Sequence, residues 1–212
     1  MNAGYHASRL IQDERRAATW RALWRHHFRH RIKPDATVLD LGAGYGDFIN
    51  SVTAARRIAL DTWPGLSDHV AAGVEPIIGP VTDLSALAEA SIDFAFASNL
   101  FEHLSQEELV QVLGQLRGKL RVDGELCILQ PNYRYAYREY FDDYTHRTPY
   151  SHIGLADLLR AHGWTVTQVA PRFLPLTIKS RLPVSPGLIR LYLASPIKPM
   201  GKQMMISARP ER

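Results

Sequence analysis

The chain has 212 residues, of which 46% are hydrophobic and 22% are charged, and its formal net charge is +4. This length and this balance are ordinary for one globular domain with a full core. Its one cysteine, Cys127, excludes an internal disulfide and a cysteine-based metal site, and charged residues interrupt every apolar stretch before it is long enough to span a membrane. Because no apolar signal-peptide core follows Met1, we expect a cytoplasmic protein without a transmembrane segment.

The basic excess gathers near the amino terminus, where residues 8–32 are predicted to form a helix. Trp20, Trp24 and Phe28 recur there at helical spacing. Residues 15–33 carry seven Arg and Lys side chains: Arg15, Arg16, Arg21, Arg25, Arg29, Arg31 and Lys33. A solvated helix face is the favoured interpretation, and contact with an anionic acceptor or a membrane surface is the alternative. The net charge is too small to make nucleic acid an expected partner.

The rest of the chain alternates predicted strands and helices. Apolar runs predict strands at 37–41, 57–61, 74–79, 92–98, 125–130, 164–170 and 203–208. Helices are predicted at 48–55, at 84–90, after the capping box of Ser105 and Glu108, and around 155–159, where Gly163 ends the helix. Asp123 and Gly124 are predicted to form a turn. This alternation implies crossover connections and therefore an α/β fold with a mostly parallel sheet.

A glycine-rich loop follows the first predicted strand, in the sequence Val38-Leu-Asp-Leu-Gly-Ala-Gly-Tyr-Gly46. Glycines let a chain turn sharply from a strand into a helix and leave room for a ligand against the backbone. The G-x-G-x-G spacing differs from the G-x-G-x-x-G of dinucleotide sites. Asp40 would repel a pyrophosphate but suits a ligand that carries an ammonium group. Asp61 ends the second strand, where a carboxylate can accept hydrogen bonds from both hydroxyls of a ribose.

These residues resemble the class I S-adenosylmethionine (SAM)-dependent methyltransferases, in the broad methyltransferase-domain group common in bacteria. The resemblance covers residues 36–170 and rests on five features in order. They are the loop of 40–46, Asp61, Asp83 followed by Leu84, the Glu-His-Leu ending of 98–104, and the turn of 120–126, where Val122 and Asp123 replace the usual Pro and Gly.

The resemblance implies a Rossmann-like three-layer sandwich whose seven-stranded sheet has helices on both faces and its last strand antiparallel near the edge. It implies a single domain over residues 1–212, with a helical cap at 1–34, a SAM-binding core at 35–170 and an insert with the last strand at 171–212. It implies SAM as cofactor and S-adenosylhomocysteine as product. The residues expected to bind SAM are Asp40, Gly42, Ala43, Gly44, Gly46, Asp61, Thr62, Asp83, Leu84, Ser98 and Asn99. For Asp83, the cap of a helix is an equally favoured interpretation.

The acceptor of the methyl group is expected beside SAM, above the fourth and fifth strands. Residues 137–149 are dense in polar aromatic side chains and are predicted to form a loop over the acceptor. His103 and His146 are the candidate catalytic residues, as general bases, because histidine titrates near neutral pH. For His103, ordering of the SAM pocket is the alternative; Asp142 and Asp143 could orient a histidine or cap a turn. No tight metal-ligand spacing is present, so no metal site is predicted.

The expected reaction is methyl transfer to a small molecule at an oxygen atom, with a sugar or a nucleotide-linked or lipid-linked sugar as candidates. Asn99-Leu100-Phe101 lacks the prolines of nucleic-acid amino-methylating enzymes. The C-terminal region resembles a subgroup found with bacterial surface-polysaccharide enzymes, and its basic residues could meet sugar phosphates: Lys179, Arg181, Arg190, Lys198 and Lys202. A basic flap on the sheet edge, or a homodimer contact, is the favoured interpretation. The alternative functions are a dinucleotide oxidoreductase, a non-catalytic SAM-binding regulator and an RNA methyltransferase.

Overall fold

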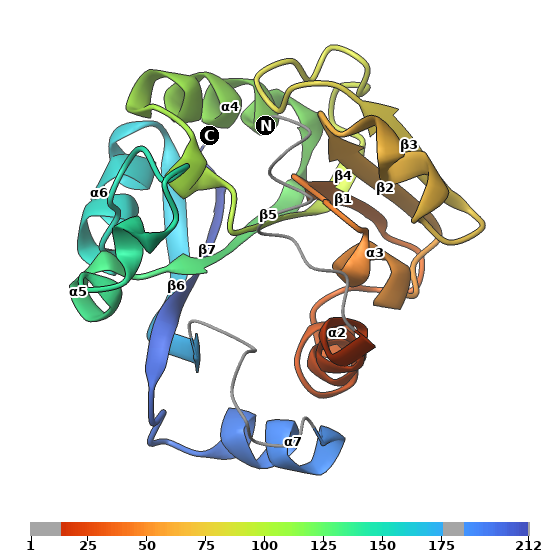
Figure 1. The fold of residues 1–212 in the computed structure, drawn as a ribbon. Helices are drawn as coiled ribbons and strands as arrows, with labels where there is room; N and C mark the ends of the chain where they lie inside the picture. The colour runs from red at the N-terminus through yellow and green to blue at the C-terminus, as the bar shows by residue number, and fades with distance from the viewer. Residues whose placement is uncertain (1–13, 176–184, 212) are drawn as a thin grey trace. The chain divides into compact units, whose positions relative to one another are not determined.

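The computed structural model describes residues 14–175 and 185–211. The chain forms two compact units, one of Met1–Pro80 with Thr177–Ile197 and one of Val81–Leu176 with Lys198–Arg212. Its seven strands are β1 (Thr37–Leu41), β2 (Arg56–Asp61), β3 (Val74–Ile78), β4 (Ile92–Ser98), β5 (Leu120–Pro131), β6 (Trp164–Pro175) and β7 (Gly201–Pro210). They form one sheet in the order β3-β2-β1-β4-β5-β7-β6 (Figure 1).

The sheet is mixed and mostly parallel. β1 pairs with β2, β2 with β3, and β4 with β5, all in parallel. β7 runs antiparallel to both of its neighbours, β5 and β6. The Rossmann-like sheet, and the reversed last strand one place from the edge, are therefore confirmed. All seven expected strands form, and the last three extend beyond the predicted runs.

In the first unit, an aromatic cluster joins the amino-terminal helix to the short helix after the glycine loop. α2 (Glu14–His26) contacts α3 (Asp47–Ser51) through Trp20 and Phe48, whose ring centroids are 5.6 Å apart. Phe28, in the 3-10 helix η1 (Phe28–His30), lies 5.4 Å from the Phe48 ring. The Nε atom of Arg16 donates to Asp47 at 2.9 Å. α7 (Pro186–Ala194) lies next to α2 in the same unit.

The predicted helices at 8–32 and 48–55 were too long. α2 ends at His26 and a separate 3-10 turn follows it, while residues 8–13 lie outside the described residues. α3 ends at Ser51, because Val52 adopts an extended conformation with ψ 138°. In both places apolar spacing continues past the point where the backbone leaves the helix.

The predicted helix at 84–90 was wrong, because this segment forms turns. Leu84 and Leu87 are buried, as expected, but two residues at this spacing also fit a turn. The backbone N–H of Leu84 donates to the Gln115 side chain at 2.9 Å. Gln115 also donates to the Thr82 carbonyl oxygen, so α4 (Gln106–Lys119) binds the segment through side chains instead of continuing it as a helix.

In the second unit, two helices begin and end where the sequence indicates. Ser105 caps α4, with the Glu108 N–H donating to Ser105 Oγ at 3.2 Å and the Ser105 N–H donating to Glu108 at 2.7 Å. α6 (His152–Ala161) is followed by Gly163 with φ 77°, and packs on β6 beside the short helix α5 (Tyr133–Ala136) (Figure 1).

The expected turn at Asp123 and Gly124 lies inside β5 instead. Between the pairs Ile92–Leu120 and Phe94–Glu125, β5 has three more residues than β4, and the extra residues form a bulge. A side chain on Gly124 would come within 3.0 Å of the Ile92 carbonyl oxygen. The glycine therefore lets two strands approach closely, which an Asp-Gly pair does not by itself distinguish from a turn.

Candidate active site

The glycine loop after β1 adopts the backbone conformation that only glycine takes readily. Gly42, Gly44 and Gly46 have φ of 67°, 56° and 69°, all in the left-handed region. A Cβ atom on Gly46 would also lie 3.2 Å from the side chains of Asn50 and Val70. The spacing of the three glycines is therefore a backbone requirement.

Asp61, at the end of β2, is hydrogen-bonded to this loop. Its carboxylate is buried and accepts the Gly44 N–H on Oδ2 and the Trp63 N–H on Oδ1, each at 2.9 Å. A carboxylate can accept about four hydrogen bonds, so these two leave capacity for further donors such as ribose hydroxyls. The geometry is consistent with the predicted ligand role of Asp61, which also fixes the loop.

Asp40 is a buried carboxyl in the same unit, only 3% exposed. Burial raises its pKa well above the usual value, the negative charge of Asp61 raises it further, and a hydrogen bond with the Ile49 backbone opposes the rise. The ionised form is therefore disfavoured unless a cation lies nearby. This is the electrostatic setting that a ligand ammonium group would relieve.

Three aromatic rings that the sequence analysis did not single out lie beside the loop. Tyr45 comes from the loop, Trp63 follows Asp61 by two residues, and His69 follows the 3-10 helix η2 (Pro64–Asp68). The three ring centroids are 4.9 Å from one another. The available signal was the position of Tyr45 and Trp63 within or next to the two predicted cofactor segments.

In the second unit, β4 ends in a strained and firmly held residue. Asn99 has φ 49°, which is uncommon for a residue with a side chain. Its N–H donates to the Leu129 carbonyl at 2.8 Å, and its Oδ1 accepts from Gln203 at 3.0 Å. Its Nδ2 donates to Ser98 at 3.2 Å. Gln203, from β7, is thus a positioning residue for Asn99 that motif spacing did not reveal.

Asp83 is exposed, and Leu84 beside it is fully buried. The Asp83 Oδ1 accepts the Ser85 N–H at 3.0 Å, and hydrogen bonds from Ser85 lower the pKa of this carboxyl. Because turns and no helix follow, the interpretation of Asp83 as a helix cap is wrong, and the residue closes a turn. Its predicted contact with adenine stays a prediction.

The two candidate catalytic histidines meet in the second unit. His103 lies in the 3-10 helix η3 (Phe101–His103), and His146 lies in the loop after the 3-10 helix η4 (Tyr140–Asp142). Their ring centroids are 4.9 Å apart. Burial, and then the nearby charge of His146, lower the pKa of His103 to about 4, so its imidazole is neutral at pH 7. The sequence separates the two histidines by more than forty residues, and the fold brings them together.

The aromatic segment is tied to η3 through the backbone. The Glu102 carbonyl oxygen accepts the Arg147 N–H at 2.8 Å and the Thr148 N–H at 3.1 Å. The Thr148 hydroxyl donates to the Leu104 carbonyl at 2.7 Å, and the Tyr140 hydroxyl donates to the Thr148 carbonyl at 2.8 Å. These bonds hold the loop over the end of β4 in a defined conformation.

Hydrogen bonds orient both histidine rings. The Thr145 hydroxyl donates to Asp143 at 2.6 Å, so it can accept from Nδ1 of His103, 3.0 Å away. Nδ1 of His146 faces the Tyr140 carbonyl oxygen at 2.5 Å, and a carbonyl only accepts. Each ring therefore carries a proton on Nδ1. Of the two candidate aspartates, Asp143 is the one that is connected to His103, through hydrogen bonds of the Thr145 hydroxyl.

Glu102 is the third polar group of this cluster, and it is fully buried. Among the described residues, neither of its carboxyl oxygens has a hydrogen-bond partner. Burial raises the pKa of Glu102 to about 8, the backbone hydrogen bond of the residue lowers it, and the charge of Asp143 adds to the rise. Buried carboxyls without partners are rare, because desolvation of the charge is uncompensated.

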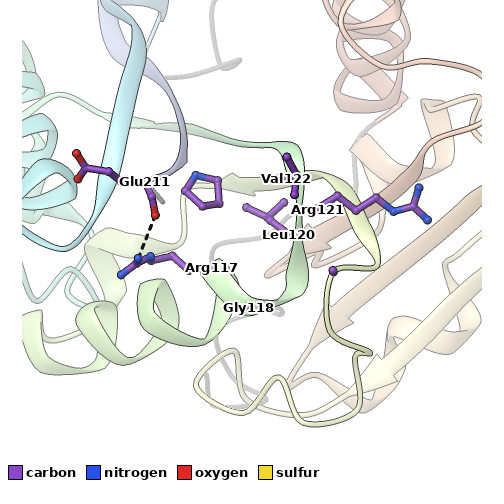
Figure 2. Close-up of a pocket in the computed structure, with 8 residues that line it drawn as sticks. Arg117, Gly118, Leu120, Arg121, Val122 and Glu211 are labelled. Atoms are coloured by element: carbon purple, nitrogen blue, oxygen red, sulfur yellow. Dashed lines mark hydrogen bonds between the residues drawn. The ribbon is translucent and has the colours of Figure 1, made fainter.

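A surface hollow lies near the amino-terminal ends of β4 and β5, away from the carboxyl ends where the candidate site residues lie. Figure 2 shows it lined by Arg117 and Gly118 of α4, by 120–122 at the start of β5 and by Glu211. Arg117 donates to the backbone oxygen of Glu211 at 3.2 Å (Figure 2). Ligands of open parallel sheets bind beyond the carboxyl ends of the strands, whereas this hollow lies where β4 and β5 begin. It is therefore not the expected cofactor site.

The C-terminal basic residues have mixed surroundings. Lys202 forms an ion pair with Glu139 at 2.6 Å, and burial lowers the pKa of Lys198. Arg190 lies in α7, and Lys179 and Arg181 lie outside the described residues.

Over the part of the chain that the structure describes, no helix combines the length and the apolar character needed to cross a membrane.

Comparison with known proteins gives a family match over part of the chain and a shared fold over nearly all of it. Residues 39–128 match the methyltransferase domain family. A SAM-dependent methyltransferase from Archaeoglobus fulgidus is similar in structure, with 20% identity over 98% of this chain and 99% of that chain and a TM-score of 0.69. The 1,6-didemethyltoxoflavin-N1-methyltransferase of Burkholderia thailandensis, solved with its substrate and S-adenosylhomocysteine, has 22% identity over 99% and 85% of the two chains and a TM-score of 0.64. A search of curated proteins gives no match.

A third structure, a SAM-dependent methyltransferase from Mesorhizobium loti, shares the fold with 14% identity over 89% of this chain and 97% of that chain and a TM-score of 0.64. The domain match lies on β1 to β5, which carry the glycine loop and the other features of the resemblance. Residues 39–128 thus carry a methyltransferase domain, and the chain shares the fold of SAM-dependent methyltransferases, as the sequence predicts. SAM is its cofactor, and the expectation of an enzyme is confirmed.

Proposed function

We propose that this methyltransferase acts on an oxygen atom of a small molecule, with a sugar hydroxyl as the first candidate. The observation that carries the proposal is the meeting of His103 and His146 at the end of β4, with both rings oriented by hydrogen bonds. An alcohol needs help to lose its proton when it is methylated, and a pair of oriented imidazoles supplies that help. The segment of 137–149, tied to η3, would cover the acceptor.

In the first unit, Asp61, Thr62 and the loop residues Gly42, Ala43, Gly44 and Gly46 are proposed to hold SAM. The free carboxylate lone pairs of Asp61 would accept the ribose hydroxyls. Asp40, which burial keeps from ionising readily, would pair as a carboxylate with the ammonium group. In the second unit, Asp83, Leu84, Ser98 and Asn99 are proposed for the adenine and methionine ends. When bound, SAM supplies an already activated methyl group, so the residues act by positioning.

The other predicted features also stay proposals. They are a single domain over residues 1–212, a cytoplasmic location, a homodimer and contact with a membrane surface. α7 exposes Leu188 at 49% and Leu191 at 68%, which supports a contact surface on that helix. Lys202 is engaged with Glu139, which weakens its case as a phosphate ligand.

Calorimetric titration with SAM, S-adenosylhomocysteine and NAD tests the cofactor site. We expect the two sulfur ligands to bind wild type and the exposed-site control Asp68→Asn equally, and to bind Asp61→Ala much more weakly. NAD should not bind. Retained SAM affinity in Asp61→Ala would show that the proposed ribose contact is wrong.

Turnover with a panel of acceptors tests the acceptor class. We expect S-adenosylhomocysteine to accumulate with a hydroxyl-bearing sugar or sugar nucleotide, and His146→Ala to slow this release without weakening SAM binding. Product formation only with RNA, with steep salt dependence, would favour the RNA methyltransferase instead.

A further inference from the structure

The cluster at the end of β4 contains more than a pair of bases. Glu102, His103 and His146 each offer one ligand atom, and these atoms lie within 4.8 Å of one another. Two of the residues are adjacent in η3, and the third comes from the loop after η4. Sequence spacing could not indicate such a set, because hydrogen bonds from Arg147 and Thr148 to the Glu102 carbonyl bring the loop into place.

The histidines are arranged as metal-binding histidines usually are. In metal sites, the nitrogen that does not bind the metal donates to a carbonyl, a carboxylate or a hydrogen-bonded group that orients the ring. Here Nδ1 of His146 faces the Tyr140 carbonyl, and Nδ1 of His103 faces Thr145, which in turn donates to Asp143. Nε2 of each ring is therefore the nitrogen that we assign to the metal.

The carboxyl of Glu102 gives an independent reason to expect a cation. Its side chain is fully buried, and neither oxygen has a hydrogen-bond partner among the described residues. Buried carboxylates in proteins are paired with a cation or coordinate a metal. Among the groups that face Glu102, the Tyr140 hydroxyl donates its proton to the Thr148 carbonyl and Asp143 is negative, so neither stabilises an ionised carboxyl.

We propose that Glu102, His103 and His146 bind one divalent transition-metal ion, with an open coordination position that faces the acceptor. Two imidazole nitrogens and one carboxylate oxygen are a known ligand set for zinc and for iron(II), and they leave positions for water or substrate. The loop of 140–148 contributes one ligand, so its closure on η3 and metal binding stabilise each other.

The consequence for catalysis rests on the proposed function. An acceptor hydroxyl on the open position would lose its proton more readily, because the cation stabilises the alkoxide. The proton leaves to solvent, and the oxygen then forms its bond to the methyl carbon as the carbon–sulfur bond breaks. In this arrangement the two histidines act as ligands, not as free bases.

The test uses the full-length, tag-free protein after treatment with a chelator. Zinc is titrated by calorimetry, and cobalt(II) is added separately so that its visible absorption reports the ligands. We expect one ion per chain in wild type and in His30→Ala, which removes an exposed histidine of η1. Glu102→Gln and His146→Ala should each lose roughly 10-fold to 100-fold or more in zinc affinity. Titration with SAM checks that each variant is folded.

The outcomes separate this proposal from the proposed function. Absence of stoichiometric zinc binding by wild type, or equal affinity in both variants, would overturn the metal site while SAM binding and turnover could stand. If a variant does not fold, Thr145→Val replaces it, since this change keeps all three ligands and removes the hydroxyl that orients His103. An unchanged cobalt spectrum and zinc affinity in Thr145→Val would also count against the site.

Discussion

The two units of this protein carry their polar residues in different ways. In the first unit, the glycine loop and Asp61 lie at the ends of two adjacent parallel strands, and each piece has a local sequence signature. In the second unit, Glu102 and His103 meet His146 only because a long segment returns to η3. A short motif therefore identifies the first site, while the second depends on tertiary hydrogen bonds that no motif contains.

The largest expected effect separates the two regions directly. In Asp61→Asn, one of the two N–H groups of Gly44 and Trp63 loses its acceptor, and the ribose contact is weakened. Hydrogen bonds to a charged group contribute about 1.5–3 kcal/mol, so we expect SAM affinity to fall by roughly 10-fold to 100-fold. Zinc affinity, measured in the same preparation, should stay at the wild-type value. A parallel loss of both affinities would show that the two regions do not function separately.

The next prediction disturbs the second region through its tertiary hydrogen bonds. Thr148→Val removes the hydroxyl that donates to the Leu104 carbonyl. A buried acceptor left unsatisfied costs about 1–3 kcal/mol, and this half-buried one costs less, so we expect a slightly lower midpoint of chemical unfolding and weaker zinc binding. SAM affinity should change little. The control is Thr165→Val, which changes an exposed residue of β6. Thr167 in the same strand is less suitable, because its hydroxyl donates to the Ser207 carbonyl.

Comparison of prediction and structure follows the same division. Strands and the capping box of Ser105 could be predicted, because continuous apolar runs and local side-chain capping are encoded within a few residues. The segment of 84–90 could not, since its turns depend on side chains of α4. In the site, the positions of Asp61 and the glycines were accessible from the sequence, whereas the contact of Gln203 with Asn99 joins strands that are far apart in the chain.

A smaller effect is expected at the helix cap formed by Ser105, which follows His103 by two residues. Ser105→Ala removes the side-chain acceptor for the Glu108 N–H at the start of α4. Loss of such a cap costs about 0.5–2 kcal/mol, which denaturant unfolding can resolve. Gln106→Ala, at the first helical position, serves as the control. If Ser105→Ala is as stable as the control, the cap contributes nothing to this helix.

The last prediction concerns Asp40 in the first unit and how the stability of the folded protein depends on pH. The pKa of Asp40 in the folded protein is raised above its usual value of 3.8, chiefly by burial. The folded state therefore holds a proton that the unfolded chain has lost, and the free energy of unfolding falls as pH rises through the interval between the two pKa values. Asp40→Asn has no such proton, so without SAM it should be more stable than wild type near neutral pH.

The difference should disappear at a pH below the usual Asp value, where both states of the wild type are protonated. It should also shrink when SAM is saturating, because the variant lacks the carboxylate that pairs with the ammonium group and gains less stability from the ligand. Chemical unfolding at about pH 3 and about pH 8, with and without SAM, measures all four values. A wild type that is the more stable protein at the higher pH without SAM would mean that Asp40 is already compensated in the folded chain, and the proposed ammonium contact would lose its electrostatic basis.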